Sequence, residues 1–197
     1  MEEQDLLKKY NQLYLEMLMR YKDHIESEES VYVAELPKLI TPDDSTVINL
    51  ASKIKSSFSQ YSYDRDFYGA ARMAYENIRD NIATISLPLQ FWLSPSQTLK
   101  CEAGDVFDKA TLLCSLLIAL GNMSTKVIIA AKEQSRTFVV YCEYGSGLIL
   151  FNLDFGISQA GSKQELLDSM NIGKDDELTA YEFNDKMYGD LCCIAPK

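Results

Sequence analysis

The chain has 197 residues, of which 47% are hydrophobic, and it carries a net charge of −10 with a pI near 4.6. This length and composition predict one globular core, with enough chain left for a helical appendage. An acidic surface repels phosphate backbones and anionic lipid, and the Lys and Arg residues are scattered among carboxylates. We therefore expect neither nucleic acid nor a membrane as partner.

The chain shows no charged leader followed by an apolar stretch, and no apolar run long enough to span a bilayer. Its five cysteines are odd in number and lack metal-ligand spacing, and His24 is the single histidine. We therefore expect a cytoplasmic protein without a metal or another cofactor. His24 lies in the charged stretch DHIESEE, which is typical of a solvated surface histidine.

Residues 2–26 form the first predicted element, a helix without Gly or Pro. Along one face, apolar and aromatic residues recur at alternating three- and four-residue spacing, at Leu7, Tyr10, Tyr14, Met17 and Tyr21. Such a face needs a partner surface. We therefore divide the chain into an N-terminal helix, residues 1–29, and a main domain, residues 30–197. The helix either docks on its own domain, which we favour, or makes a homo-oligomer contact.

Three shorter elements follow before the centre of the chain. Residues 31–40 predict an extended crossing that Pro37 limits to an edge or irregular strand. The run Thr41-Pro42-Asp43-Asp44 predicts a helix start, with the helix reaching about Phe58, and Asp64 opens another helix. The run Ser94-Pro95-Ser96-Gln97 has the residues of a capping box and predicts a short helix ending near Cys101.

Residues 106–120 form the predicted central helix. Asp105 stands where a helix N-cap accepts backbone N–H groups, and Gly121 suits the left-handed position after the last turn. The helix is apolar nearly all round, with Val106, Ala110, Leu113, Cys114 and Leu117 on the face expected to be buried most deeply. A helix of this kind lies inside a fold.

After Gly121 the hydrophobic period becomes that of strands. We expect strands over 126–131, 137–144 and 148–153, with Gly145-Ser146-Gly147 joining the last two as an antiparallel hairpin. A short helix capped by Ser162 and a strand over 178–183 complete the prediction. The fold class is therefore α+β, with N-terminal helices and a central helix packed on an antiparallel sheet.

The run Gly104-Asp105-Val106, followed by Ala110, Leu112, Leu113, Leu116, Leu117 and Gly121, is similar to a known motif. It resembles the transglutaminase-like superfamily, relatives of the papain-type cysteine proteases, in which Gly-Asp-Cys opens the central helix. Upstream, residues 91–99 resemble the family's lead-in. Downstream, residues 136–139 stand where the family has His-Ala-Trp-Val, and residues 153–155 stand where it has Leu-Asp-Pro. The resemblance covers residues 47–155 and implies a transglutaminase-like, papain-like fold.

The same resemblance implies that the catalytic triad has been lost. Val106 replaces the cysteine, Arg136 replaces the histidine, and only Asp154 is retained. A triad needs a nucleophile, a base within hydrogen-bond reach and a group that orients the base. Valine forms no thiolate, and arginine does not give up its proton near neutral pH. We therefore expect a pseudoenzyme without catalytic residues. For Cys101 and the other cysteines, packing is favoured over catalysis.

The former active site is expected to be a cleft between the start of the central helix and the sheet, lined by Trp92, Val106, Phe107, Arg136, Phe138 and Asp154. Arg136 and Asp154 either form an ion pair there, or Arg136 points to solvent and Asp154 belongs to a turn. Two functions stay open. The favoured one is a catalytically inactive module that binds a protein partner or assembles. The alternative is a hydrolase or acyltransferase of altered chemistry, with a non-family nucleophile such as Cys101.

Overall fold

The computed structural model describes residues 2–28, 33–86, 89, 91–132, 135–172 and 177–191. The chain divides into two compact units. One, here called the N-terminal unit, contains Met1–Val31 and Ser86–Trp92, and the other, the main unit, contains Tyr32–Ile85 and Leu93–Lys197. Each unit is described by itself.

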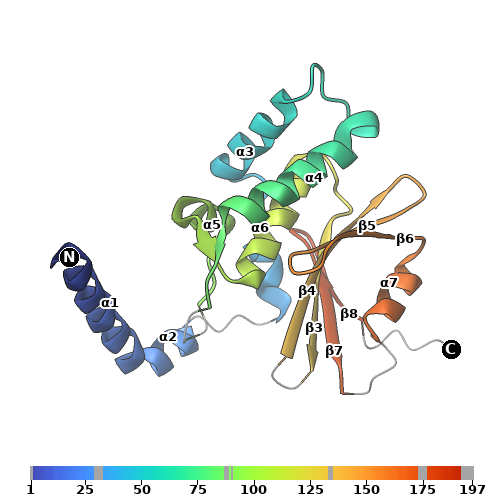
Figure 1. Cartoon of the computed structure of the whole chain (residues 1–197). Coiled ribbons are helices and arrows are strands. Elements are labelled where there is room, and N and C mark those ends of the chain that lie inside the picture. The colour runs from blue at the N-terminus through green and yellow to red at the C-terminus, as the bar shows by residue number, and fades with distance from the viewer. Residues whose placement is uncertain are drawn as a thin grey trace. The chain divides into compact units, whose positions relative to one another are not determined.

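The N-terminal unit contains helices α1, Glu2–Arg20, and α2, Lys22–Glu28 (Figure 1). The sequence predicted one helix through residue 26, but the helix is interrupted at Tyr21. The backbone N–H of Tyr21 is shared between the carbonyl oxygens of Met17 and Leu18, at 3.3 and 3.2 Å, which is the bifurcated geometry of a helix terminus. Among the described residues, no helix is long and apolar enough to cross a bilayer.

Large apolar side chains of α1 are exposed in the structure. Eight of them have exposed fractions between 40% and 61%, namely Leu7, Tyr10, Leu13, Tyr14, Leu15, Met17, Leu18 and Met19. The rings of Tyr10 and Tyr14 stack one turn apart, with centroids 6.4 Å from each other. The amphipathic face that the sequence predicted is therefore present on a helix, and it is wider than a narrow coiled-coil seam.

In the main unit, the segment before the first α-helix differs from the prediction. Residues 33–39 form a 3-10 helix, η1, Val33–Leu39, where the sequence predicted an extended crossing. Pro37 explains the difference, because its fixed φ suits a helical turn as well as an extended strand, and the Pro37 carbonyl accepts the N–H of Ile40 at 3.1 Å. Residues 31 and 32 of the predicted crossing lie outside the described part of the chain.

Four α-helices then form one layer of the main unit. They are α3, Ser45–Ser56, α4, Tyr63–Asn81, α5, Pro95–Cys101, and α6, Val106–Ala119. The start of α3 falls later than predicted because Asp44, rather than Thr41, is its N-cap and accepts the N–H of Thr46 at 2.8 Å. Ser94 and Gln97 form the predicted capping box at the start of α5. Two short strands, β1, Ala83–Thr84, and β2, Ala103–Gly104, pair in parallel beside this layer.

The second layer is a six-stranded sheet in the order β6-β5-β4-β3-β7-β8, with every neighbouring pair antiparallel. Its strands are β3, Lys126–Lys132, β4, Ser135–Tyr144, β5, Gly147–Asn152, β6, Gly156–Ala160, β7, Thr179–Phe183, and β8, Tyr188–Asp190. The hairpin at Gly145 and the strand ending at Phe183 are confirmed. Strands β6 and β8 were not predicted. The sheet confirms the α+β class.

The helices cover opposite faces of this sheet (Figure 1). Helix α6 packs on β3 and β4 on one face and contacts α3, α4 and α5 on its outer side, so it is the central helix of the fold, as predicted. Helix α7, Lys163–Ser169, packs on the other face, where Leu166 and Leu167 join a core with Val139 and Leu150. Ser162 caps α7 as expected, accepting the N–H of Glu165.

Both ends of α6 are satisfied by hydrogen bonds. At its C-terminal end, Lys55 Nζ donates to the carbonyl of Ala119 at 2.9 Å, and the Tyr61 hydroxyl donates to that of Leu120 at 2.9 Å. Gly121 follows with φ +115°, the left-handed geometry that its position predicted. The carbonyls that an α-helix leaves unpaired therefore have partners, which fixes the helix on which the candidate site stands.

Candidate functional site

The N-terminus of α6 is built around a reciprocal pair of carboxylates. Asp105 Oδ1 accepts the N–H of Asp108 at 2.8 Å, and Asp108 Oδ2 accepts the N–H of Asp105 at 2.9 Å, so the two residues form a capping box. Gly104 makes room for it, because a Cβ there would lie 2.9 Å from the Cβ of Asp108. The predicted N-cap role of Asp105 is confirmed.

Asp108 is the more deeply placed of the two carboxylates. Its side chain is buried, and its Oδ1 accepts the N–H of Leu93 at 2.8 Å. Burial raises the pKa of Asp108 to about 6, although the N–H groups of Asp105 and Leu93 act in the opposite direction. The positive end of the helix dipole thus faces two carboxylates that belong to the chain itself.

Val106 stands where the sequence resemblance predicts a nucleophile, and its side chain is a hydrocarbon. Val106 is the first residue of α6 and is half-buried. The next residue, Phe107, is buried, and its ring lies 5.5 Å from that of Phe138 on β4 and 6.3 Å from that of Phe183 on β7. Of the predicted lining residues, the structure thus brings Phe107 and Phe138 into direct contact. They form an aromatic layer between helix and sheet.

Arg136 and Asp154 are not paired. Arg136 lies at the start of β4 and Asp154 in the turn between β5 and β6, and both are exposed. The salt bridges of the described residues do not join them. The ion pair offered as one reading of the sequence is therefore absent, and the structure has the other reading. Asn152 holds the turn, because its Oδ1 accepts the N–H groups of Asp154 and Phe155 at 2.8 and 3.0 Å.

Trp92 belongs to the N-terminal unit, whereas the other predicted lining residues belong to the main unit. Its place in the cleft therefore stays a prediction. His24 also belongs to the N-terminal unit and is exposed on α2, as its charged surroundings predicted. Within the described ranges, no group of three His, Cys, Asp or Glu side chains has the arrangement needed to hold a metal ion.

The described cysteines fall into two kinds. Cys101 is exposed at the end of α5, whereas Cys114 and Cys142 are buried. Burial raises the pKa of the Cys114 thiol well above its ordinary value and that of Cys142 to about 12. Both therefore behave as small apolar core residues, as predicted for Cys114. Cys192 and Cys193 lie outside the described residues.

Lys109 also lies in this region, although it was not among the predicted site residues. It is buried, and its Nζ donates to the carbonyl of Ile82 at 2.8 Å and to Thr84 Oγ1 at 3.0 Å. Burial lowers the pKa of Lys109, while the carboxylate of Asp154 opposes this effect. The sequence feature that could have indicated its burial is a lysine within a mainly apolar helix. Its amine ties α6 to the segment around β1.

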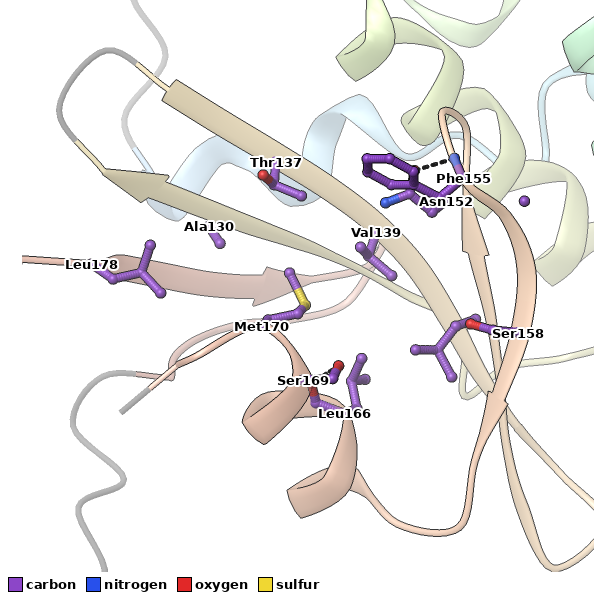
Figure 2. Close-up of a pocket in the computed structure, with 12 residues that line it drawn as sticks. Ala130, Thr137, Val139, Asn152, Phe155, Ser158, Leu166, Ser169, Met170 and Leu178 are labelled. Atoms are coloured by element: carbon purple, nitrogen blue, oxygen red, sulfur yellow. Dashed lines mark hydrogen bonds between the residues drawn. The ribbon is translucent and has the colours of Figure 1, made fainter. Parts of the chain in front are cut away.

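A separate pocket lies on the opposite face of the sheet, the face covered by α7 (Figure 2). Side chains alternate between the faces of a strand, so Phe138 points toward α6 while Thr137 and Val139 point toward α7. The pocket has a volume of about 450 Å³ and is lined by β-strand and α7 residues, among them Val139, Leu150 and Leu166. It contains neither Val106 nor Arg136.

Three solved structures of LapG from Legionella pneumophila are similar to this chain. The EGTA-treated form is 16% identical, and the match covers 79% of this chain and 92% of the LapG chain with a TM-score of 0.47. The calcium-bound form is 15% identical, with coverages of 72% and 86% and a TM-score of 0.44. A third structure is 16% identical, with coverages of 73% and 88% and a TM-score of 0.43. No family model matches the sequence, and none of the curated proteins matches it. The chemistry of the site therefore rests on this chain's own residues.

Proposed function

We propose that this chain is a catalytically inactive, transglutaminase-like protein of the cytoplasm that acts by binding another protein or by assembling. The observation that carries the proposal is Val106 at the first position of α6, followed by Phe107, whose ring packs on that of Phe138. A hydrocarbon branch at that position cannot attack a carbonyl carbon. The sequence resemblance supports the fold alone, because a fold does not establish an activity. Val106 and Arg136 argue against the family's reaction.

The electrostatics of the helix start support the same proposal. Acyl transfer through a cysteine is helped by unpaired N–H groups that stabilise a thiolate or an oxyanion. Here the N–H groups of Asp105 and Asp108 are already bonded to carboxylate oxygens, so these two groups are not available to a thiolate or an oxyanion. Arg136 is exposed and cannot serve as a general base. The positions of Val106 and Arg136 therefore supply neither a nucleophile nor a general base for the family's reaction.

The surface proposed for protein binding is the apolar side of α1. Eight large apolar side chains of this helix are exposed, which is more than isolated surface residues require. Lys9, Gln12, Glu16 and Arg20 border the same surface and provide a polar rim for a partner helix. The partner is either another protein or a second copy of the chain.

Thiol labelling of the native protein tests the absence of catalysis. The rate of iodoacetamide reaction is measured against pH for each cysteine, with peptides identified by mass spectrometry. We expect Cys101 to react in the native protein because it is exposed, and Cys114 and Cys142 to react only after unfolding, because both are buried and burial raises their pKa values. A single fast cysteine with a strongly depressed pKa would reverse the proposal and favour the alternative enzyme. C101S then serves to identify that nucleophile.

Sedimentation velocity over a concentration series tests the binding role of α1. The double variant L13K/M17K removes two exposed apolar side chains, and N11K is the control, because Asn11 is exposed on the same helix but lies outside that surface, and the change removes no apolar area. We expect association, with itself or with a protein captured from the native host, to be lost in L13K/M17K and kept in N11K. Equal association of both variants would rule out the α1 surface.

A further inference from the structure

The pocket between the sheet and α7 has the composition of a small-molecule site. The twelve described residues that line it contain no charged side chain. The walls are mainly aliphatic, from Ala130, Val139, Leu150, Leu166, Met170 and Leu178. In Figure 2 the ring of Phe155 lies at one end of the pocket, and Leu166 and Ser169 of α7 lie at the other. The volume of about 450 Å³ falls within the range of sites that hold small organic ligands.

Polar groups at the pocket are few and uncharged. Thr137 and Ser158 are exposed, and neither hydroxyl makes a hydrogen bond to another described residue. Asn152 uses its Oδ1 for the turn at Asp154 and Phe155, which leaves its amide N–H groups without a partner in the described part of the chain. One carbonyl or hydroxyl oxygen of a ligand therefore finds donors here, while an ammonium group finds no carboxylate among the described lining residues.

The charges near the pocket decide which head group fits. Glu182 lies on the same face of the sheet, but its carboxylate is already bonded to Lys126, Lys163 and Tyr141, so it offers little to a cation. The lysines are engaged by the same carboxylate and lie outside the lining. The net charge of −10 opposes an anionic ligand. An uncharged head group neither needs a free carboxylate nor is repelled by the net negative charge.

We propose that this pocket binds an uncharged amphiphile, with its aliphatic chain on the β-strand and α7 side chains and its hydroxyl or carbonyl oxygen at Thr137, Asn152 and Ser158. Phe155 covers the chain at the mouth of the pocket. Its side chain is 89% exposed, although it is held by the Asn152 turn, and an apolar ligand gives it a contact. This site is separate from α1 and from the start of α6, so it does not depend on the proposed function.

Isothermal titration calorimetry with three ligands of equal chain length tests the head-group claim. The probes are 1-decanol, decanoate and decylamine, each below its aggregation concentration, with the full-length protein. We expect 1-decanol to bind saturably at one site and at least about tenfold more tightly than decanoate or decylamine, a difference of about 1.4 kcal/mol. Equal affinities for the three probes, or no saturable binding of 1-decanol, would overturn the proposal.

A pair of matched variants tests the location. A130L fills the pocket, whereas A131L makes the same change at the next residue of β3, whose side chain points to the other face of the sheet. We expect A130L to weaken 1-decanol binding by about tenfold or more, as displacement of roughly two methylene contacts implies, and A131L to leave it unchanged. F155A changes an exposed side chain that the fold does not need, and it should weaken binding as well. Unchanged affinity in both A130L and F155A would contradict the site.

Discussion

The carboxylate of Asp108 accepts the backbone N–H of Leu93 at 2.8 Å, which joins the start of α6 to the segment that precedes α5. The same carboxylate accepts the N–H of Asp105. One buried side chain thus holds the segments at Leu93 and Asp105 against the first turn of the central helix. Its ionisation state therefore affects the stability of the candidate site.

We predict that Asp108 makes the fold more stable in mild acid than at neutral pH. The pKa of Asp108 in the folded chain is raised to about 6 from an ordinary value of 3.8, so the folded state binds the proton more tightly. Its contribution is present in full below the unfolded pKa and is lost as the pH rises through about 6. Urea unfolding of the native protein and of D108N at about pH 5 and about pH 7.5 isolates this effect. The stability difference should be about 1 kcal/mol larger at the lower pH, and a pH-independent difference would contradict the assignment.

A second prediction concerns Lys109, whose amine donates to the buried carbonyl of Ile82. K109M keeps most of the aliphatic stem but leaves that carbonyl without its partner, so we expect a loss of about 1–3 kcal/mol of unfolding free energy. K100M is the control, because Lys100 is exposed on the neighbouring helix α5, and it should change stability by less than about 0.5 kcal/mol. If K109M were as stable as K100M, the buried amine would have no structural role.

Glu182 should show the pH dependence opposite to that of Asp108. Burial alone would raise its pKa, but hydrogen bonds from Lys163 and Tyr141 and the charge of Lys126 hold the pKa of Glu182 below its ordinary value of 4.5. Its contribution to stability is therefore present above the unfolded pKa and is lost as the pH falls through the lower, folded value. NMR titration of the Glu182 carboxyl in the native protein and in Y141F should show a higher pKa in the variant, which lacks the hydroxyl donor.

The same cluster gives a stability prediction. E182Q leaves two lysine ammonium groups without their carboxylate, and both lysines are partly exposed, so we expect a loss of about 2–3 kcal/mol rather than the larger cost of a fully buried pair. E143Q changes an exposed glutamate on β4 and should have an effect near zero. Equal stability of the two variants, measured by urea unfolding, would show that the cluster contributes nothing.

The proposed placement of the family motif on this sequence can be tested by introducing the family's cysteine and histidine at the matching positions. In V106C/R136H, the new thiol stands at the first position of α6, where the helix N-terminus lowers a cysteine pKa. We expect a labelling pKa below the ordinary value of a free cysteine, although the carboxylates of Asp105 and Asp108 reduce the shift. V106C alone is the control for the imidazole. An ordinary pKa in both variants would count against the placement of the motif.

Local signals in the sequence predicted the best-defined parts of the fold. Asp105, Ser94 and Gly121 act through contacts within a few residues, and each has the predicted role in the structure. The central helix was predicted because its apolar residues cover all sides. The extended crossing predicted around Pro37 was wrong, because proline fits both an extended strand and a 3-10 turn. Only tertiary contacts decide between the two.

The candidate site was less predictable because its features depend on long-range geometry. The aromatic contact between Phe107 and Phe138 follows from motif positions, but the exposure of Arg136 does not. The buried amine of Lys109 needs the carbonyl of Ile82, 27 residues earlier in the chain. The pocket at α7 needs β6, a strand that contains Gly156 and two polar residues and lacks an alternating apolar pattern.

Strand β4 is the shared wall of two environments, with Phe138 on the aromatic side and Thr137 and Val139 on the aliphatic side. Because neighbouring residues of a strand face opposite ways, deletion of one residue early in β4 would exchange the two sets of side chains. Thr137 would then enter the aromatic layer and Phe138 would block the pocket. The number of residues in β4 therefore affects two sites that share no residue. An in-frame insertion or deletion of one residue there would disrupt both.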